Sequence, residues 1–121
     1  MITAENATKR FDNITAVDHV CAEVRDGSVY GLIGSNGAGK STFLRMLAGI
    51  LRPDEGAVRI DGADIYENIA LKERFFFISD EQFFFSNCTP AEMKNYYKRF
   101  YQHFDEERYR KLMQGFGLDE K

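Results

Sequence analysis

The stretch GSNGAGKST, residues 34–42, decides the fold of this chain. It fits the pattern G-x-x-x-x-G-K-[ST] and lies between an apolar segment, residues 29–33, and a run with helical spacing that begins at Ser41. Glycines let the backbone bend so that successive N–H groups point at phosphate oxygens, with no side chain in the way. The free amides at the start of the following helix add partial positive charge. The stretch therefore predicts a loop that cradles the phosphates of a nucleoside triphosphate.

Two side chains of the loop have distinct predicted tasks. Lys40 can bridge the β- and γ-phosphates, and the Ser41 hydroxyl can be a ligand of Mg²⁺. The alternative is a glycine turn that precedes Lys-Ser by accident. At ordinary glycine usage such a match arises on the order of once in a few hundred chains of this size. The apolar segment before the loop and the helical pattern after it make an accident rarer still.

Outward from the loop, the chain shows strand patterns in its first part and helix patterns in its tail. The run after the loop keeps helical spacing at Phe43, Leu44, Leu47 and Ile50. Asp61-Gly62 predicts a turn. Strands are expected at residues 2–8, 16–24, 29–33, 57–60 and 75–78.

Thr89, Pro90 and Glu92 predict the start of a long helix, residues 89–104. Threonine is a favoured cap, proline suits the first helical position, and a glutamate three residues after the cap completes a capping box. Asp105 is expected to cap a last helix.

The composition is that of one modest globular domain. The chain has 121 residues, of which 44% are hydrophobic and 29% are charged, and its net charge is −3. An acidic balance offers no basic field to attract nucleic acid, so no nucleic-acid partner is expected. The polar start has no apolar signal-peptide core, and no apolar run reaches the roughly 18 residues that span a bilayer. We therefore expect a cytoplasmic protein.

Beyond the loop, three further motifs resemble the nucleotide-binding domain of ABC transporters. They are Leu47-Ala48-Gly49, Pro53-Asp54-Glu55-Gly56 and Ile60-Asp61-Gly62, in the family's order and approximate spacing. The resemblance implies an α/β fold with a P-loop NTPase-like parallel core, an N-terminal antiparallel β part and the start of a helical subdomain. Residues 1–88 would form the ATP-binding core portion, and residues 89–121 would begin the helical subdomain of the same domain.

The resemblance also implies ATP and Mg²⁺ as ligands, a second nucleotide-binding domain and an integral membrane permease as partners. The chain would then lie at the cytoplasmic membrane through the permease. The ATP-binding residues it implies are Phe11, Gly34, Ser35, Asn36, Gly37, Ala38, Gly39, Lys40, Ser41 and Thr42.

Phe11 lies where the family places an aromatic side chain that stacks on adenine. It ends the first predicted strand and is followed by a polar turn, Asp12-Asn13. Stacking of a base on an aromatic ring is worth roughly 1–3 kcal/mol. The alternative is an ordinary core phenylalanine at a strand end.

The stretch FFFISDEQFFF, residues 75–85, matches the strand and loop that in this family carry a glutamine near Mg²⁺. Asp80 falls nearest to the place of that glutamine, and a carboxylate is also an Mg²⁺ ligand. Glu81 or Gln82 would fill the place if the loop is longer. Residues 83–85 have two readings, as core under the next helix or as an apolar rim that docks a short helix of a membrane partner.

Several expected motifs do not occur in these residues. The family domain continues with a Leu-Ser-Gly-Gly-Gln signature, a strand that ends in aspartate and glutamate, and a switch histidine. We therefore expect the N-terminal portion of an incomplete domain, which binds ATP weakly and does not hydrolyse it alone, with the catalytic base beyond Lys121. The alternatives are a soluble ABC-type ATPase not linked to transport, a non-catalytic nucleotide-binding half-domain and, more distantly, a P-loop kinase.

Overall fold

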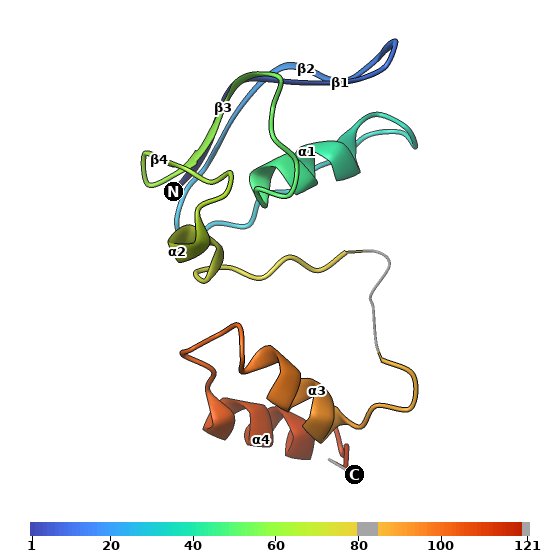
Figure 1. The fold of residues 1–121 in the computed structure, drawn as a ribbon, viewed down its shortest axis with the longest axis vertical. Coiled ribbons are helices and arrows are strands. Elements are labelled where there is room, and N and C mark those ends of the chain that lie inside the picture. The colour runs from blue at the N-terminus through green and yellow to red at the C-terminus, as the bar shows by residue number, and fades with distance from the viewer. Residues whose placement is uncertain (80–84, 120–121) are drawn as a thin grey trace. The chain divides into compact units, whose positions relative to one another are not determined.

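The computed structural model describes residues 1–79 and 85–119 of the chain. Contacts within the chain divide it into two units, Met1–Phe77 and Ile78–Lys121 (Figure 1), and each unit is described by itself. The predicted domain boundary, between residues 88 and 89, lies later in the chain than the division between Phe77 and Ile78. It falls just ahead of the first helix of the second unit and stays a prediction.

The first unit is built on one antiparallel sheet with the strand order β2-β1-β3-β4. Successive side chains of a strand point to opposite faces of the sheet, and Ala4, Val17 and Val58 are buried on the core side. The strands predicted at residues 2–8, 16–24 and 57–60 are confirmed. The strands are β1 (Ile2–Phe11), β2 (Ile14–Val24), β3 (Glu55–Ile60) and β4 (Ala63–Asp64).

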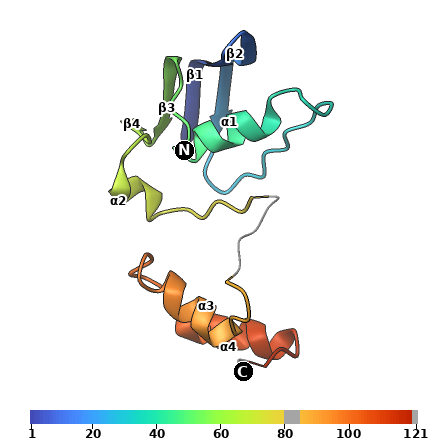
Figure 2. The same cartoon turned by 45° about the vertical axis from the view of Figure 1, so that its right-hand side comes forward.

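Helix α1 (Lys40–Leu47) covers one face of this sheet and contacts β1, β2 and β3 (Figures 1 and 2). Phe43 and Met46 are buried against the strands. The predicted apolar face was partly wrong, because Leu44 and Ile50 are exposed. Ile50 leaves the helical phase because the helix has already ended.

The end of α1 has a specific cause. Gly49 adopts φ 61°, its N–H donates to the Met46 carbonyl and the Ile50 N–H donates to the Arg45 carbonyl, each at 2.9 Å. This pair of hydrogen bonds is the Schellman pattern, which needs a left-handed residue at this place. A Cβ at Gly49 would also lie 2.8 Å from the Ile65 carbonyl oxygen. The chain then turns back into β3.

The core of the first unit is completed after β4 by a short helix, α2 (Ile69–Lys72), which buries Leu71. The Asn68 side chain caps it by accepting a hydrogen bond from the Leu71 N–H at 3.1 Å. The buried core cluster consists of Ala4, Ala7, Val17, Phe43, Met46, Val58, Ile60, Ile65 and Leu71.

The predicted parallel core is not formed in the described part of the chain. Residues 29–33 and 75–78 are not strands there, and all the described strand pairs are antiparallel. Val29 and Ile33 are almost fully exposed. A strand that reads as buried on both faces needs hydrogen-bonding neighbours and covering layers. The four described strands pair only with one another, so residues 29–33 have no hydrogen-bonding strand beside them there. Of these residues, Leu32 packs against the core cluster.

The second unit contains two helices, α3 (Pro90–Tyr97) and α4 (Glu106–Gly115). The capping box at Thr89 and Glu92 and the cap at Asp105 are confirmed. The helix predicted for residues 89–104 was too long. After Lys98 the amides of Arg99 and Phe100 donate to carbonyls three residues back, which tightens the last turn. Crowded aromatic side chains lose rotamer freedom in a helix and favour this early end.

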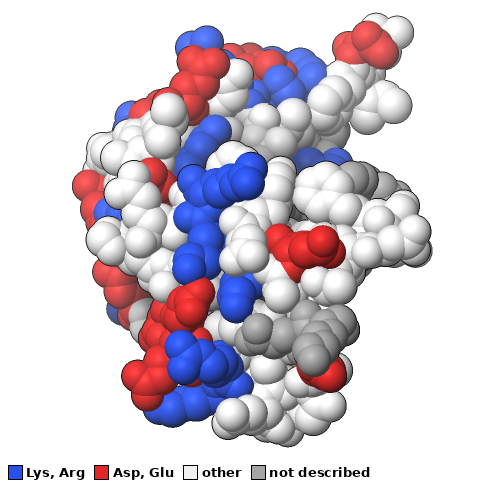
Figure 3. All heavy atoms as spheres, turned by 60° about the horizontal axis from the view of Figure 1, so that its bottom comes forward, with Lys and Arg blue, Asp and Glu red and all other residues white. Residues whose placement is uncertain are grey.

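Charged side chains of both signs lie beside one another on the face drawn in Figure 3. Ion pairs within the first and the second unit include Lys9 with Asp54 and Lys98 with Glu106, respectively. In the described part of the chain, helices are too short and too polar to cross a membrane.

Candidate phosphate-binding site

The glycine-rich loop lies between residues 29–33, all of which except Leu32 are exposed, and the start of α1. Gly37 and Gly39 adopt φ values of 81° and 82°, a backbone conformation that residues with a side chain rarely adopt. Gly39 also faces β2 so closely that a Cβ would lie 1.9 Å from the Ala16 carbonyl oxygen. The Gly39 carbonyl accepts the first helical hydrogen bond, from the Phe43 N–H at 2.9 Å. The loop is therefore bent and pressed against the sheet at the point where the helix begins.

The N-terminus of α1 carries no cap of its own. The N-cap residue is Gly39, no side chain accepts a hydrogen bond there, and the first turn contains no acidic residue. The first amides of a helix have no partner within the helix, and their dipoles favour an anion. The Ser41 side chain is exposed in this first turn, and Thr42 is half-buried. The predicted phosphate-binding amides and the predicted Mg²⁺ ligand thus share one short turn.

Lys40 folds back over the loop. Its ammonium group donates to the Gly34 carbonyl oxygen at 2.8 Å and to the Ser35 carbonyl oxygen at 2.6 Å. These acceptors carry no formal charge, so they hold the ammonium group in place without neutralising it. The structure thus places a full positive charge at the mouth of the predicted phosphate cradle.

A hollow of about 320 Å³ lies between the loop and the start of β2. Its volume is at the lower end of the range for small-molecule sites. It is lined by Thr15, Ala16, Val17, Asp18, Val20, Leu32, Ile33, Ala38, Gly39, Lys40 and Phe43.

Phe11 is the last residue of β1 and pairs with Ile14 across a two-residue turn. Its side chain is 44% exposed and is not part of the buried core. The Lys9 ammonium group lies 5.7 Å from the centre of its ring. In Figure 1 this hairpin turn and the glycine-rich loop lie on the same side of the first unit. The role of Phe11 in stacking stays a prediction.

The predicted second Mg²⁺ ligand, Asp80, lies outside the described residues, as do Glu81 and Gln82. Among the residues that are described, no group of three or more His, Cys, Asp or Glu side chains could hold a metal ion. Of the second phenylalanine triplet, only Phe85 is described. It is exposed, and its ring lies 5.0 Å from that of Tyr96 in an edge-on arrangement.

Similarity to a known protein family identifies the family of this chain. A family described as "ABC transporter" matches residues 17–121, which is most of the chain. The chain belongs to the ABC transporter ATP-binding family. Members of this family bind ATP with Mg²⁺.

This ABC cassette is similar to ATP-binding proteins of transport systems. It is 37% identical over 91 residues to a probable sulfate/thiosulfate import ATP-binding protein from Chlorella vulgaris, covering 75% of this chain and 39% of that protein. It is 34% identical over 93 residues to a bacitracin transport ATP-binding protein from Bacillus licheniformis, covering 76% of this chain and 30% of that protein. The chain therefore spans well under half the length of these relatives.

Solved structures share the fold. An ATP-binding subunit of an ABC transporter superposes with a TM-score of 0.83 at 24% identity, over 98% of this chain and 51% of that one. A dimeric ATP-binding cassette with bound ADP and phosphate superposes with a TM-score of 0.52 at 28% identity, over 61% of this chain and 34% of that one. The described cassette portion has the ABC ATPase fold.

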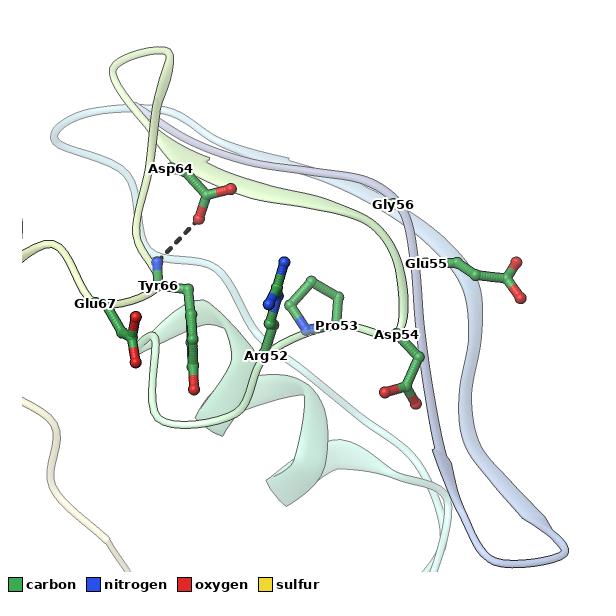
Figure 4. A pocket seen from close by; sticks show the side chains of 8 residues that line it. All are labelled: Arg52, Pro53, Asp54, Glu55, Gly56, Asp64, Tyr66 and Glu67. Carbon is green, nitrogen blue, oxygen red and sulfur yellow. Dashed lines mark hydrogen bonds between the residues drawn. The ribbon is translucent and has the colours of Figure 1, made fainter.

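A second hollow of the cassette, of about 620 Å³, lies around the turn between α1 and β3. Arg52 lies over the ring of Tyr66, with 5.8 Å from its guanidinium carbon to the ring centre. Figure 4 shows Arg52 between Pro53 and Tyr66, and it shows the Asp54 side chain pointing away from them. The acidic side chains that line this hollow do not converge on one point, so the hollow has no metal-site arrangement.

Sequence reasoning missed the contacts that surround Phe11. Lys9 precedes Phe11 by two residues, a spacing that is visible in the sequence. Regular alternation would place both side chains on one face of β1. The pairing of β1 with β2 shifts register between Lys9 and Arg10, so alternation alone does not predict this contact. Asp54, which binds Lys9 at 2.7 Å, is 45 residues away in the chain. No local pattern of residues reveals that contact.

Proposed function

We propose that this chain is the N-terminal, nucleotide-binding portion of the ATP-binding subunit of an ABC transporter. The observation that carries the proposal is the uncapped start of α1 with the Lys40 ammonium group beside it. In this proposal the loop amides and Lys40 bind the β- and γ-phosphates of ATP. On binding, Lys40 exchanges the Gly34 and Ser35 carbonyls for phosphate oxygens.

The remaining ligand contacts follow from the same placement. The Ser41 hydroxyl is a ligand of Mg²⁺, and Asp80 is proposed as a second acidic contact on the metal side. Bound Mg²⁺ offsets the negative charge of the phosphates. The exposed ring of Phe11 stacks on adenine, which fixes the other end of the nucleotide.

Transport is the proposed purpose of ATP binding. ATP is sandwiched between this cassette and a second nucleotide-binding domain, and the pair drives a separate membrane permease from the cytoplasmic side. The relatives carry names for cargoes as different as sulfate and bacitracin. This supports a common nucleotide-binding role, with the cargo chosen by the permease. Copurification with an integral membrane protein supports transport, whereas a soluble ABC-type ATPase has no such partner.

Binding is tested by ³¹P NMR titration of the chain with Mg·ATP, for wild type and Lys40→Ala. Loss of a charged hydrogen-bond donor costs about 1.5–3 kcal/mol, so roughly 10- to 100-fold weaker binding is expected. Lys111→Ala is the matched control, because Lys111 is an exposed lysine paired with Glu107 in α4. Equal affinity of wild type and Lys40→Ala contradicts the proposal.

Hydrolysis of ATP is not expected from this chain alone. These residues contain neither the signature sequence nor the carboxylate that orients the attacking water, and positioning supplies most of phosphoryl-transfer catalysis. A phosphate-release assay with wild type and Lys40→Ala checks this expectation. Release above the uncatalysed rate that depends on Lys40 contradicts it.

A further inference from the structure

Asp54 is bound to three successive residues that lead to Phe11. It lies in the turn that follows α1, and its N–H donates to the Thr8 carbonyl oxygen at 2.8 Å. Its carboxylate accepts one hydrogen bond from the Lys9 ammonium group and one from the Arg10 N–H, both at 2.7 Å. One side chain thus ties the end of β1 to the turn before β3.

The contact with Lys9 extends to the aromatic ring. The Lys9 side chain is only 16% exposed, and its ammonium group lies over the Phe11 ring at 5.7 Å from the ring centre. A cation over an aromatic face is attracted by the electrons of the ring. Asp54 therefore fixes the cation that covers one face of Phe11.

Asp54 is ionised when it makes these contacts. The hydrogen bond from Lys9 and the one from the Arg10 N–H hold the pKa of its carboxyl below the ordinary value of 3.8. A second contact steadies the same strand end, because the Arg10 guanidinium group donates to the neighbouring Glu55 carboxylate at 2.6 Å. The strand end is therefore held by paired charges.

We propose that Asp54 is a positioning residue for the nucleobase. Through Lys9 it sets the orientation of the Phe11 ring and closes one face, which leaves the other face for the base to stack on. This inference rests on the proposed function, in which Phe11 stacks on adenine. It adds that a residue outside both the loop and the first strand controls recognition of the base rather than of the phosphates.

The test compares a ligand that carries a nucleobase with a ligand that has only the phosphates. Affinities of the chain for Mg·ATP and for Mg·tripolyphosphate are measured by ³¹P NMR in wild type, Asp54→Asn, Phe11→Ala and the double variant. Asp54→Asn is expected to weaken ATP binding about 5- to 10-fold, part of the stacking contribution, and to leave tripolyphosphate within about twofold of wild type. The double variant is expected to lose no more than Phe11→Ala alone.

Glu5→Gln is the matched control. It removes an exposed carboxylate on β1, which accepts a hydrogen bond from the Arg59 guanidinium group at 2.6 Å, and it is expected to change neither affinity. If Asp54→Asn does not fold, Lys9→Met replaces it, since Lys9→Met removes the cation and keeps the Asp54 contact with the Arg10 N–H. The same selective loss is expected from Lys9→Met.

Four results overturn the inference. If Asp54→Asn binds ATP as tightly as Glu5→Gln, or if it weakens tripolyphosphate as much as ATP, Asp54 has a merely structural role and the proposed function still stands. If Asp54→Asn and Phe11→Ala losses add in the double variant, the two residues act independently. If wild type binds neither ligand, the proposed function fails and this inference fails with it.

Discussion

At the scale of single residues, Gly39 is the most constrained position of the glycine-rich loop. Its φ of 82° favours glycine, and the Ala16 carbonyl oxygen occupies the space where a side chain would begin. The backbone of β2 cannot move aside easily, because β2 is hydrogen-bonded to β1 along its length. The loop thus depends on one absent side chain for its curvature and for its contact with the sheet.

Gly39→Ala is expected to lower the free energy of unfolding and to abolish phosphate binding. A non-glycine residue in a rare backbone conformation costs about 1–3 kcal/mol, and the clash with β2 adds to this. Urea unfolding and ³¹P titration measure the two effects. Gly31→Ala is the control, because Gly31 has no positive φ and a Cβ there meets nothing within 4 Å. Equal behaviour of the two variants would show that the loop tolerates a side chain.

At the scale of elements, α3 is the clearest case of local sequence that determines local structure. The Thr89 hydroxyl accepts from the Glu92 N–H at 3.3 Å, and the Glu92 carboxylate accepts from the Thr89 N–H at 2.8 Å. Pro90 follows the cap and loses no hydrogen bond there. These contacts satisfy amides that the helix itself leaves unpaired. The start of α3 is therefore encoded within four residues.

The capping box makes α3 sensitive to acid. The Thr89 N–H and hydroxyl hold the pKa of Glu92 below its ordinary value of 4.5. A group whose pKa is lower in the folded state stabilises the fold above the unfolded pKa and loses that contribution as pH falls. We expect NMR titration of the Glu92 carboxyl to give a midpoint below 4.5, with loss of α3 helicity below that midpoint. A midpoint at or above 4.5 contradicts the capping box.

Features that depend on residues close together in the chain were predicted correctly, whereas features that depend on contacts between distant residues were not. The caps at Thr89 and Asp105 and the turn at Asp61-Gly62 depend on neighbours in the chain, and all three were predicted. The exposure of Ile50 was not predicted, because it depends on the end of α1 at Gly49, where the carbonyl of the distant residue Ile65 leaves no room for a side chain. Residues 29–33 were predicted as a strand because they form a short apolar run. A strand also needs a neighbouring strand to pair with, and the described sheet does not offer one. The contacts of Asp54 with β1 are equally long-range.

At the scale of the whole molecule, the two units are unequal in their cores. All members of the buried core cluster belong to the first unit. Helices α3 and α4 contain no buried residue, and the contacts of this unit include the ring pair Phe104–Tyr109 and the ion pair Lys98–Glu106. Burial of apolar surface is the main source of folding free energy. The first unit therefore carries most of the stability that this chain has.

Residues 1–77, expressed alone, are expected to keep the antiparallel sheet, whereas residues 78–121 alone are expected to lose most of their helix. Isolated helices shorter than about 12–15 residues are marginal in water. Circular dichroism and NMR amide dispersion measure both fragments. The full chain provides the reference spectra. A folded 78–121 fragment together with an unfolded 1–77 fragment would reverse the assignment of stability.

The exposed segment at residues 29–33 has a consequence for the handling of this polypeptide in a cell or a test tube. Val29 and Ile33 present apolar surface, and the backbone between them has no strand on either side. An exposed apolar segment of this kind is prone to aggregation. The solubility of this polypeptide therefore depends in part on Val29 and Ile33, two side chains just ahead of the glycine-rich loop.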